Sequence, residues 1–169
     1  PTSKINFSNN NTTFDTNGVQ FVINPYDEYG LTKSLVIKEA MGGTVTVINV
    51  GPASTEPTIR KALAIGADTA IRVNAEATDA FFVASQIAHV AKQNNYDLIV
   101  CGQESIDYNG GQVAGMVAAL LNMPFVNVCV GLNIDGTTAT VLREIDGGKE
   151  ELKATLPMVV GGKKGLVEE

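Results

Sequence analysis

The stretch DLIVCGQESIDYNGGQVAGMVAALLN holds the residues of this chain that are best suited to chemistry. The apolar run Leu98–Cys101 predicts a buried strand, which opens at Gly102 into a polar loop. The loop closes with Gly110-Gly111 and leads into a helix expected from about Gln112 to Leu121. Unpaired backbone N–H groups and the dipole at such a helix start favour a phosphate, and glycine lets a ligand approach the backbone. An ordinary loop between a strand and a helix would account for the same residues.

Groups that could perform acid–base or metal chemistry are scarce. The single histidine, His89, falls on the polar side of a helix predicted over residues 78–93, where a surface role is expected. Cys101 and Cys129 lie in apolar strand-like runs and are predicted to be buried free thiols, so a zinc site is not supported. Asp107 would repel a phosphate, so it would sooner contact a ribose or a base edge, or brace the loop. We therefore predict a protein that holds a ligand and has no catalytic residue.

Ligands of parallel sheets bind outside the carboxyl ends of the strands. Besides the loop above, the segments Asn49–Ser54 and Asn74 follow predicted strands. The turn at Gly51-Pro52 is a second place where a ligand could touch backbone, although a tight turn into a helix explains it equally well. The chain contains neither G-x-G-x-x-G nor G-x-x-x-x-G-K-[ST], so neither a standard dinucleotide fingerprint nor a Walker loop is supported.

Strands and helices alternate over the first three quarters of the chain. Predicted strands cover 4–7, 19–23, 44–50, 70–73 and 98–101, and an Asn-rich turn that ends at Asn17-Gly18 joins the first two. Predicted helices cover 25–41, 55–65, 78–93 and 112–121. Residues 125–132, 138–145 and 150–156 predict an antiparallel meander, and 158–160 one more buried strand. The expected fold is α/β, a doubly wound mostly parallel sheet with an added meander near the C-terminus, in a single domain over residues 1–169.

Composition sets the class of protein. The 169 residues are 44% hydrophobic and 18% charged, which is typical of one globular domain. The net charge of −6 argues against nucleic acid as a partner and against a polybasic membrane patch. No apolar run approaches the roughly 18 residues of a membrane-spanning helix. We expect a cytoplasmic protein that is not an integral membrane protein.

Several motifs, in the same order along the chain, are similar to those of one known family. They are NPYD at Asn24–Asp27, TIRKALAIGAD at Thr58–Asp68, the loop from Gly102 to Gln112, REIDGG at Arg143–Gly148, and LPMVV at Leu156–Val160. Over residues 4 to 160 the chain resembles the β subunit of electron transfer flavoproteins.

This resemblance implies a fold like that of the adenine nucleotide alpha hydrolases and a heterodimer with an α subunit. One FAD would be shared with, and mostly held by, the α subunit, while the β subunit would bind a structural AMP. Electrons would pass from donors such as acyl-CoA dehydrogenases of fatty acid oxidation to a quinone reductase or another acceptor. Gly110, Gly111 and Gln112 would offer backbone N–H groups to the phosphate. By position, the implied nucleotide-binding residues are Asn24, Pro25, Tyr26, Asp27, Val50, Gly51, Asp107, Tyr108, Asn109, Gly110, Gly111, Gln112, Val113, Ala114, Gly115, Met116, Val117 and Ala118.

The chain also departs from the family's pattern. The family opens with a strand ending near K-x-V-P-D, whereas this sequence starts at Pro1, so we expect that strand to be missing or Pro1 to be its remnant. No residue can be assigned to the family's partner-recognition loop or C-terminal arm. The loop Tyr108–Gly111 is richer in glycine than the AMP pattern, which leaves open an electron-bifurcating relative with a second FAD in place of AMP. Two further hypotheses are a stand-alone ATP-binding module of the universal-stress type and an interaction domain without a small ligand.

Overall fold

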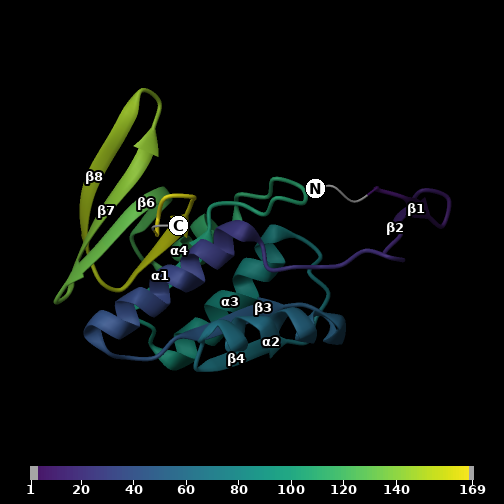
Figure 1. The fold of residues 1–169 in the computed structure, drawn as a ribbon, viewed down its shortest axis with the longest axis horizontal. Helices are drawn as coiled ribbons and strands as arrows, with labels where there is room; N and C mark the ends of the chain where they lie inside the picture. Colours follow the sequence, from purple (N-terminus) through teal and green to yellow (C-terminus); the bar gives the residue numbers. More distant parts are fainter. Residues whose placement is uncertain (1–3, 168–169) are drawn as a thin grey trace.

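The computed structural model describes residues 4–167 as a body of helices and sheets from which two hairpins project on opposite sides (Figure 1). The helices are α1 (Pro25–Met41), α2 (Glu56–Ile65), α3 (Ala80–Asn94) and α4 (Val113–Leu121), and a short 3-10 helix, η1 (Ala53–Thr55), precedes α2. The strands are β1 (Phe7–Ser8), β2 (Thr13–Phe14), β3 (Thr46–Val50), β4 (Thr69–Val73), β5 (Leu98–Gly102), β6 (Phe125–Asp135), β7 (Thr138–Ile145), β8 (Gly148–Thr155) and β9 (Met158–Gly162). Pro1 lies outside the described residues. Within them, we find no helix whose length and apolar character would let it span a bilayer.

The prediction of parallel strands with an added antiparallel meander is confirmed, but the prediction of one continuous sheet is wrong. β3 and β4 form a separate parallel pair, with Thr46 opposite Thr69. The main sheet has the order β5-β9-β6-β7-β8, in which β5, β9 and β6 are parallel and β6, β7 and β8 form the meander. Among the described residues, β3 and β5 therefore each hydrogen-bond along one edge only. No backbone hydrogen bonds join β3 to β5, so the strands predicted to form one sheet are divided between a β3–β4 pair and the main sheet.

The N-terminal segment also differs from the prediction. The hairpin pairs β1 with β2, and residues 19–23 lie in no strand. The hairpin turn falls at Asn9, Asn10 and Asn11, whose φ values of 52°, 55° and 65° are left-handed. It lies in the segment predicted as an Asn-rich turn, but ends well before Asn17-Gly18 because β2 begins at Thr13. Asparagine tolerates this conformation better than other side chains, because its short amide can hydrogen-bond locally. Three asparagines in a row therefore set the hairpin turn.

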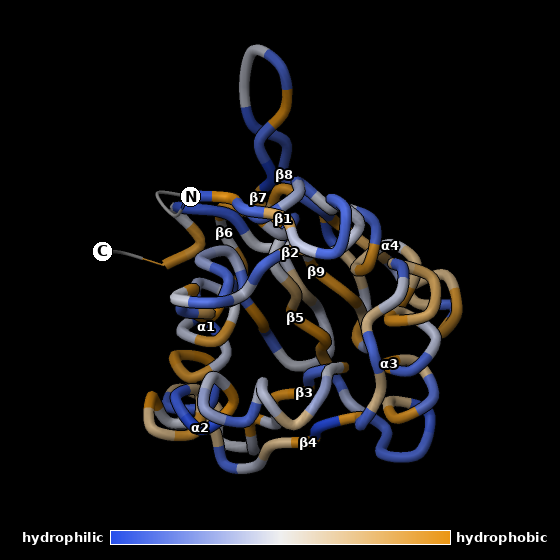
Figure 2. The backbone as a smooth tube through the Cα atoms, turned by 90° about the vertical axis from the view of Figure 1, so that its right-hand side faces the viewer, coloured by the Kyte–Doolittle hydropathy of each residue, from blue (hydrophilic) through white to orange (hydrophobic). Residues whose placement is uncertain are grey.

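Side chains of β9 alternate between two hydrophobic clusters, one on each face of the main sheet. Met158 and Val160 are fully buried in a cluster that also contains Cys129 and Val141, and the α1 residue Ile37 packs against it. Val159 is fully buried in a second cluster with residues of α3 and α4. Burial on both faces is expected for a central parallel strand. Figure 2 shows β5 and β9 as apolar strands in the interior, while the β7–β8 hairpin extends beyond the body.

A β-bulge interrupts the pairing of β6 with β9 between Val126 and Cys129. Val128 inside the bulge has φ 58°, a left-handed conformation that costs an L-residue roughly 1–2 kcal/mol. Its neighbour Asn127 lies against Gly161, because a Cβ added at Gly161 would be 1.9 Å from Asn127 Oδ1. Glycine on the facing strand therefore leaves room for the Asn127 side chain as it lies here, and the bulge stores backbone strain at Val128.

We predict that Val128→Gly stabilises the protein by about 0.5–1 kcal/mol, because relief of the left-handed strain exceeds the added backbone entropy cost. Val130→Gly is the matched control, since its φ is not left-handed. It should destabilise by about 1 kcal/mol. Urea denaturation of both variants measures the difference, and equal losses in the two would contradict the strain.

Asp68 ties the end of α1 to the starts of β3 and β4. Its carboxylate accepts a hydrogen bond from Lys38 Nζ at 2.5 Å and another from the Val45 backbone N–H at 2.7 Å. The bond from Lys38, and after it the bond from Val45, holds the pKa of Asp68 below its ordinary value. This contact explains why the TIRKALAIGAD motif ends in an aspartate.

The lowered pKa predicts a pH dependence of stability. A carboxyl whose pKa is lower in the folded state stabilises the protein above its unfolded pKa of about 3.9, and this contribution is lost as the pH falls through the folded pKa. Wild type should therefore lose urea resistance below about pH 4 more steeply than Asp68→Asn. Lys38→Met should flatten the profile in the same way. Parallel profiles for all three proteins would show that the contact is unimportant.

Candidate functional site

Asn24 and Asp27, at the start of α1, hold the loop that follows β5. Asn24 Nδ2 donates to the Glu104 carbonyl at 2.7 Å and to Asp27 Oδ2 at 2.8 Å, and Asn24 Oδ1 accepts from the Ile106 backbone N–H at 3.2 Å. Asp27 Oδ1 accepts from the Gly102 backbone N–H at 2.6 Å. We call this set of contacts the loop latch. It joins segments that lie about 80 residues apart in the sequence.

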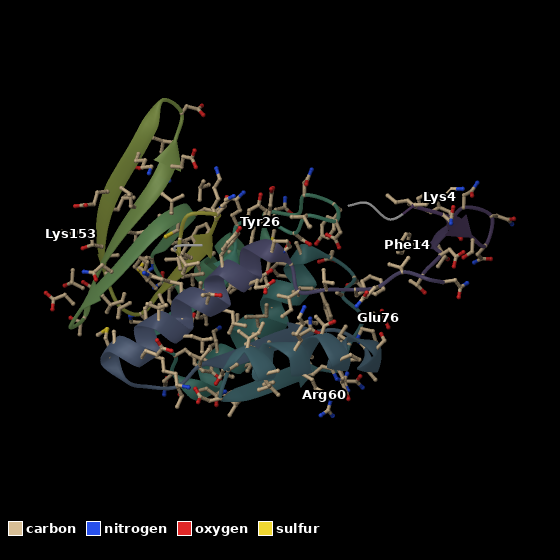
Figure 3. The ribbon with its side chains drawn as sticks, viewed as in Figure 1. Lys4, Phe14, Tyr26, Arg60, Glu76 and Lys153 are labelled. Carbon is tan, nitrogen blue, oxygen red and sulfur yellow. The ribbon has the colours of Figure 1, made fainter. Side chains whose placement is uncertain are left out.

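Gly102 lets the latch close. A Cβ added there would lie 2.8 Å from Tyr26 Cβ and 2.9 Å from the Asp27 backbone nitrogen, so a side chain at this position would force the two segments apart. Figure 3 shows Tyr26 where the start of α1 approaches the edge of the main sheet. Asn24 precedes the first residue of α1, but its side chain makes no cap bond, because its amide hydrogen-bonds to the loop.

The loop is also braced from within. The Ser105 backbone N–H donates to the Gly110 carbonyl at 3.0 Å and closes a turn whose tip contains Asn109 with φ 55°. Asp107 Oδ1 accepts from Ser105 Oγ and, at 2.9 Å, from the Tyr108 backbone N–H. These contacts support the prediction that Asp107 stabilises the loop itself.

Tyr108 lies folded over Gly110. A Cβ added at Gly110 would be 2.2 Å from Tyr108 Cε2, so glycine is required for this ring position. The ring is otherwise largely exposed, at 69%. Tyr108 and Gly110 thus form the outer surface of the loop.

The start of α4 is open to an anion. Gln112, its N-cap residue, makes no side-chain cap bond, and the first intrahelical hydrogen bond runs from Met116 N–H to the Gln112 carbonyl at 3.1 Å. Gly111 and Gln112 are exposed. A helix start with exposed, uncapped backbone is a favourable place for a phosphate.

Beyond this start, the predicted site residues of α4 pack into the protein. Ala114, Val117 and Ala118 are buried against Val159, with Val113 and Met116 packed at the rim of the same cluster. Their side chains fix the position of the helix, so a ligand would meet backbone here.

Gly115 serves the same packing, because a Cβ there would lie 3.2 Å from the Phe125 ring. Of the predicted stretch 107–118, the loop portion is therefore the part exposed toward a ligand.

Val50 and Gly51 lie at the carboxyl end of β3. The Gly51 backbone N–H donates to the Val73 carbonyl at 3.1 Å, and Arg72 donates to the Gly51 carbonyl at 3.1 Å. These bonds tie the turn to β4 and not to the loop after β5. Within the described part of the chain, the structure thus unites Asn24–Asp27 with the loop, while Val50 and Gly51 belong to the neighbouring sheet.

Sequence reasoning did not single out three buried amide oxygens, one near the carboxyl end of β3, one just after β5 and one in the first part of β6. Asn49 Oδ1, Gln103 Oε1 and Asn127 Oδ1 are closed from solvent and have no hydrogen-bond partner within the protein. Buried acceptors of this kind are normally satisfied by a donor, such as a water or a ligand group. The available signal was a polar residue inside an apolar strand run, as in TVTVINV for Asn49 and FVNVCV for Asn127.

His89 lies on the surface and the Cys129 thiol is buried, as predicted, whereas Cys101 is half-buried. Both cysteines are free, and burial, with a further contribution from Asp27, raises the pKa of Cys101 to about 12. A thiol with so high a pKa is a poor nucleophile. His89 is exposed, with its Nε2 3.2 Å from Gln93 Nε2.

We predict that Asn24→Ala loosens the loop without unfolding the body. The Ile106 amide loses its acceptor, so its hydrogen exchange should accelerate at least about tenfold, whereas exchange at Ile99 in β5 should not change. Asn94→Ala, which removes a hydrogen bond to Val90 at the end of α3, is the matched control. Hydrogen exchange measured by NMR gives the rates, and unchanged exchange at Ile106 would refute the latch.

Comparison with known proteins shows the family of the chain. The model of the electron transfer flavoprotein domain family matches residues 11–169. The electron transfer flavoprotein subunit beta of Bacillus subtilis (strain 168) is 38% identical over 155 residues, covering 89% of this chain and 60% of the relative. The same subunit of Thermoanaerobacterium thermosaccharolyticum is 33% identical over 152 residues, covering 88% and 58%.

The human electron transfer flavoprotein subunit beta is 34% identical over 163 residues, covering 93% of this chain and 64% of the relative. The chain thus spans about three fifths of the length of the curated relatives it matches. Because the family model covers nearly the whole sequence, the chain belongs to the electron transfer flavoprotein domain family.

Proposed function

We propose that this chain is the β-type subunit of a heterodimeric electron transfer flavoprotein, and that it binds a structural AMP at the loop between β5 and α4. The names of its relatives, which are beta subunits, support an α subunit as its partner. The observation that carries the AMP proposal is the uncapped, exposed start of α4 beside a loop that the latch holds fixed. Like the relatives, the chain is proposed to act in electron transfer and not as a conventional enzyme.

The residues present fit an adenine nucleotide. Gly111 and Gln112 are exposed at the helix start, where backbone N–H groups would donate to the phosphate. Asn49 Oδ1 and Gln103 Oε1 are acceptors without partners, and the ribose hydroxyls and the adenine amine are donors. Asn24 and Asp27 would act on the nucleotide through the loop that they hold.

The electron-carrying group of the proposed heterodimer is FAD, mostly held by the α subunit, and it would supply the redox chemistry when bound. This chain's own part is to bind AMP, to keep the loop rigid and to dock the α subunit. Acyl-CoA dehydrogenases are the proposed class of donors, and a quinone reductase or another oxidant the acceptor. A cytoplasmic location is supported by the two free thiols, which suit a reducing compartment.

The proposal predicts that AMP stabilises the protein and that Gly111→Val weakens this effect. A ligand that binds only the folded state at a hundredfold excess over its dissociation constant adds about 2.7 kcal/mol of stability. A Cβ at Gly111 meets no atom closer than 3.4 Å, so the fold should tolerate valine, while its methyl groups would obstruct the exposed helix start. Isothermal titration with AMP should show at least about a tenfold weaker affinity for the variant, which corresponds to about 1.4 kcal/mol.

Gly148→Val is the matched control, because nothing lies within 4 Å of a Cβ there and the residue is on the distant hairpin. It should leave the AMP affinity unchanged. Full AMP affinity in Gly111→Val would show that AMP does not bind at this loop. An absence of AMP binding by the wild-type protein would show that AMP is not the ligand.

A further inference from the structure

The N-terminal arm, residues 4–23, carries a hairpin that stands away from the body at the side opposite the β7–β8 hairpin (Figures 1 and 3). The arm returns to the body at Ile23, which packs against the cluster of Leu31, Ala62 and Ala67. Figure 3 marks Lys4 and Phe14 on the arm. β1 and β2 pair with each other and with no further strand of the described chain. The arm is held by local hydrogen bonds, such as that from the Asp15 N–H to the Asn6 carbonyl at 2.9 Å. A ribbon of two short strands is marginal by itself and gains stability by packing against something else.

Large apolar side chains of the arm are exposed along its length. Phe7 and Phe14 are directly opposed across the hairpin, so their side chains emerge on the same face, and they are 58% and 38% exposed. Ile5, two residues before Phe7, is 65% exposed. In the segment that leads back to the body, Phe21 is 64% and Val22 59% exposed. Exposed apolar side chains gathered in this way mark interaction surfaces.

The arm is also poor in charge. Its only charged residues are Lys4 and Asp15, which cancel, whereas the whole chain has a net charge of −6. Three of the six phenylalanines of the chain lie within it. Depletion of charge together with enrichment in aromatic residues is the composition found at the centre of protein–protein interfaces.

The exposed area is sufficient for part of an interface. A phenylalanine side chain has a surface of roughly 200 Å². With the exposed fractions given above, Phe7, Phe14 and Phe21 together expose about 300 Å². Each partner of a stable interface buries about 800 Å², so these rings would form part of the contact surface. The surface continues into a hollow of about 350 Å³ between Val19–Val22 and the start of α2, where Pro57 and Lys61 line it. A partner that covers the arm would extend into this hollow.

The composition and placement point to a partner chain as the occupant. We propose that the arm is a docking element for the α subunit, and that the α subunit presents an apolar, charge-poor surface to Phe7 and Phe14. This inference rests on the proposed function. A second copy of this chain is disfavoured as the occupant, because two bodies that each carry −6 repel one another.

The test compares two variants of the full chain, each coexpressed with the cognate α subunit and also purified alone. Phe7→Asp/Phe14→Asp places charge on the arm. Phe81→Asp is the matched control, since Phe81 on α3 is 61% exposed and lies outside the arm. Titration with the α subunit gives the affinity, light scattering gives the oligomeric state, and circular dichroism with AMP titration reports on the body.

The double variant should bind the α subunit at least about 100-fold more weakly, while Phe81→Asp stays within about threefold of wild type, because truncation of buried aromatic anchors dominates interface energetics. Both variants should bind AMP as wild type does. Ile5→Asp, a change outside both strands, should weaken the α-subunit complex without touching the hairpin pairing.

Undiminished α-subunit affinity in the double variant would overturn the inference and leave the proposed function intact. A wild-type homodimer that the double variant dissociates would assign the arm to a second copy instead. A wild-type chain that binds no α subunit would overturn the inference together with the heterodimer proposal. Loss of α-subunit binding with intact AMP binding is the outcome expected here.

Discussion

The start of α1 holds the loop after β5 through three hydrogen bonds, two made by Asn24 and one by Asp27. The two Asn24 bonds satisfy backbone groups of a segment outside any strand or helix, and the Asp27 bond satisfies the N–H of Gly102, the last residue of β5. Gly102 allows the approach, since a side chain there would meet the α1 backbone. The position of the loop relative to α1 depends on this contact, while packing against Val159 fixes α4. A loop that is already ordered loses little entropy when a ligand binds, which favours affinity.

The candidate site divides its work between backbone and side chains. The exposed glycine-bearing segment before α4 offers backbone, while Val117 and Ala118 anchor the helix in the core. Asn24 and Asp27 would affect the nucleotide indirectly, by holding the loop in position. This division suits a structural nucleotide, which needs a rigid cradle and no reactive group. The high pKa of Cys101 agrees with an inert interior beneath the loop.

Most elements could be predicted because their patterns are local. The strand Thr138–Ile145 and the helix ending at Leu121 follow from alternation, apolar runs and turn residues. The separation of β3 from β5 could not be predicted, since pairing between distant strands leaves no local pattern. An Asn-rich turn was predicted in the N-terminal segment, but its end was placed too late because the Asn-Gly pair lies beyond β2.

In the site, the loop and its glycines were visible in the sequence. The commitment of the Asn24 amide to Glu104 was not visible, because it depends on a contact 80 residues away. The left-handed Val128 was equally hidden, since valine gives no sign of that conformation.

The central claim is that this chain holds an adenine nucleotide as a structural part. Denaturing the purified protein and identifying the released small molecule by mass spectrometry tests it most directly. Release of AMP in close to equal proportion to the protein is the predicted result. Release of FAD in that proportion would contradict AMP as the ligand and favour an electron-bifurcating relative, and release of ATP would favour a stand-alone ATP-binding module.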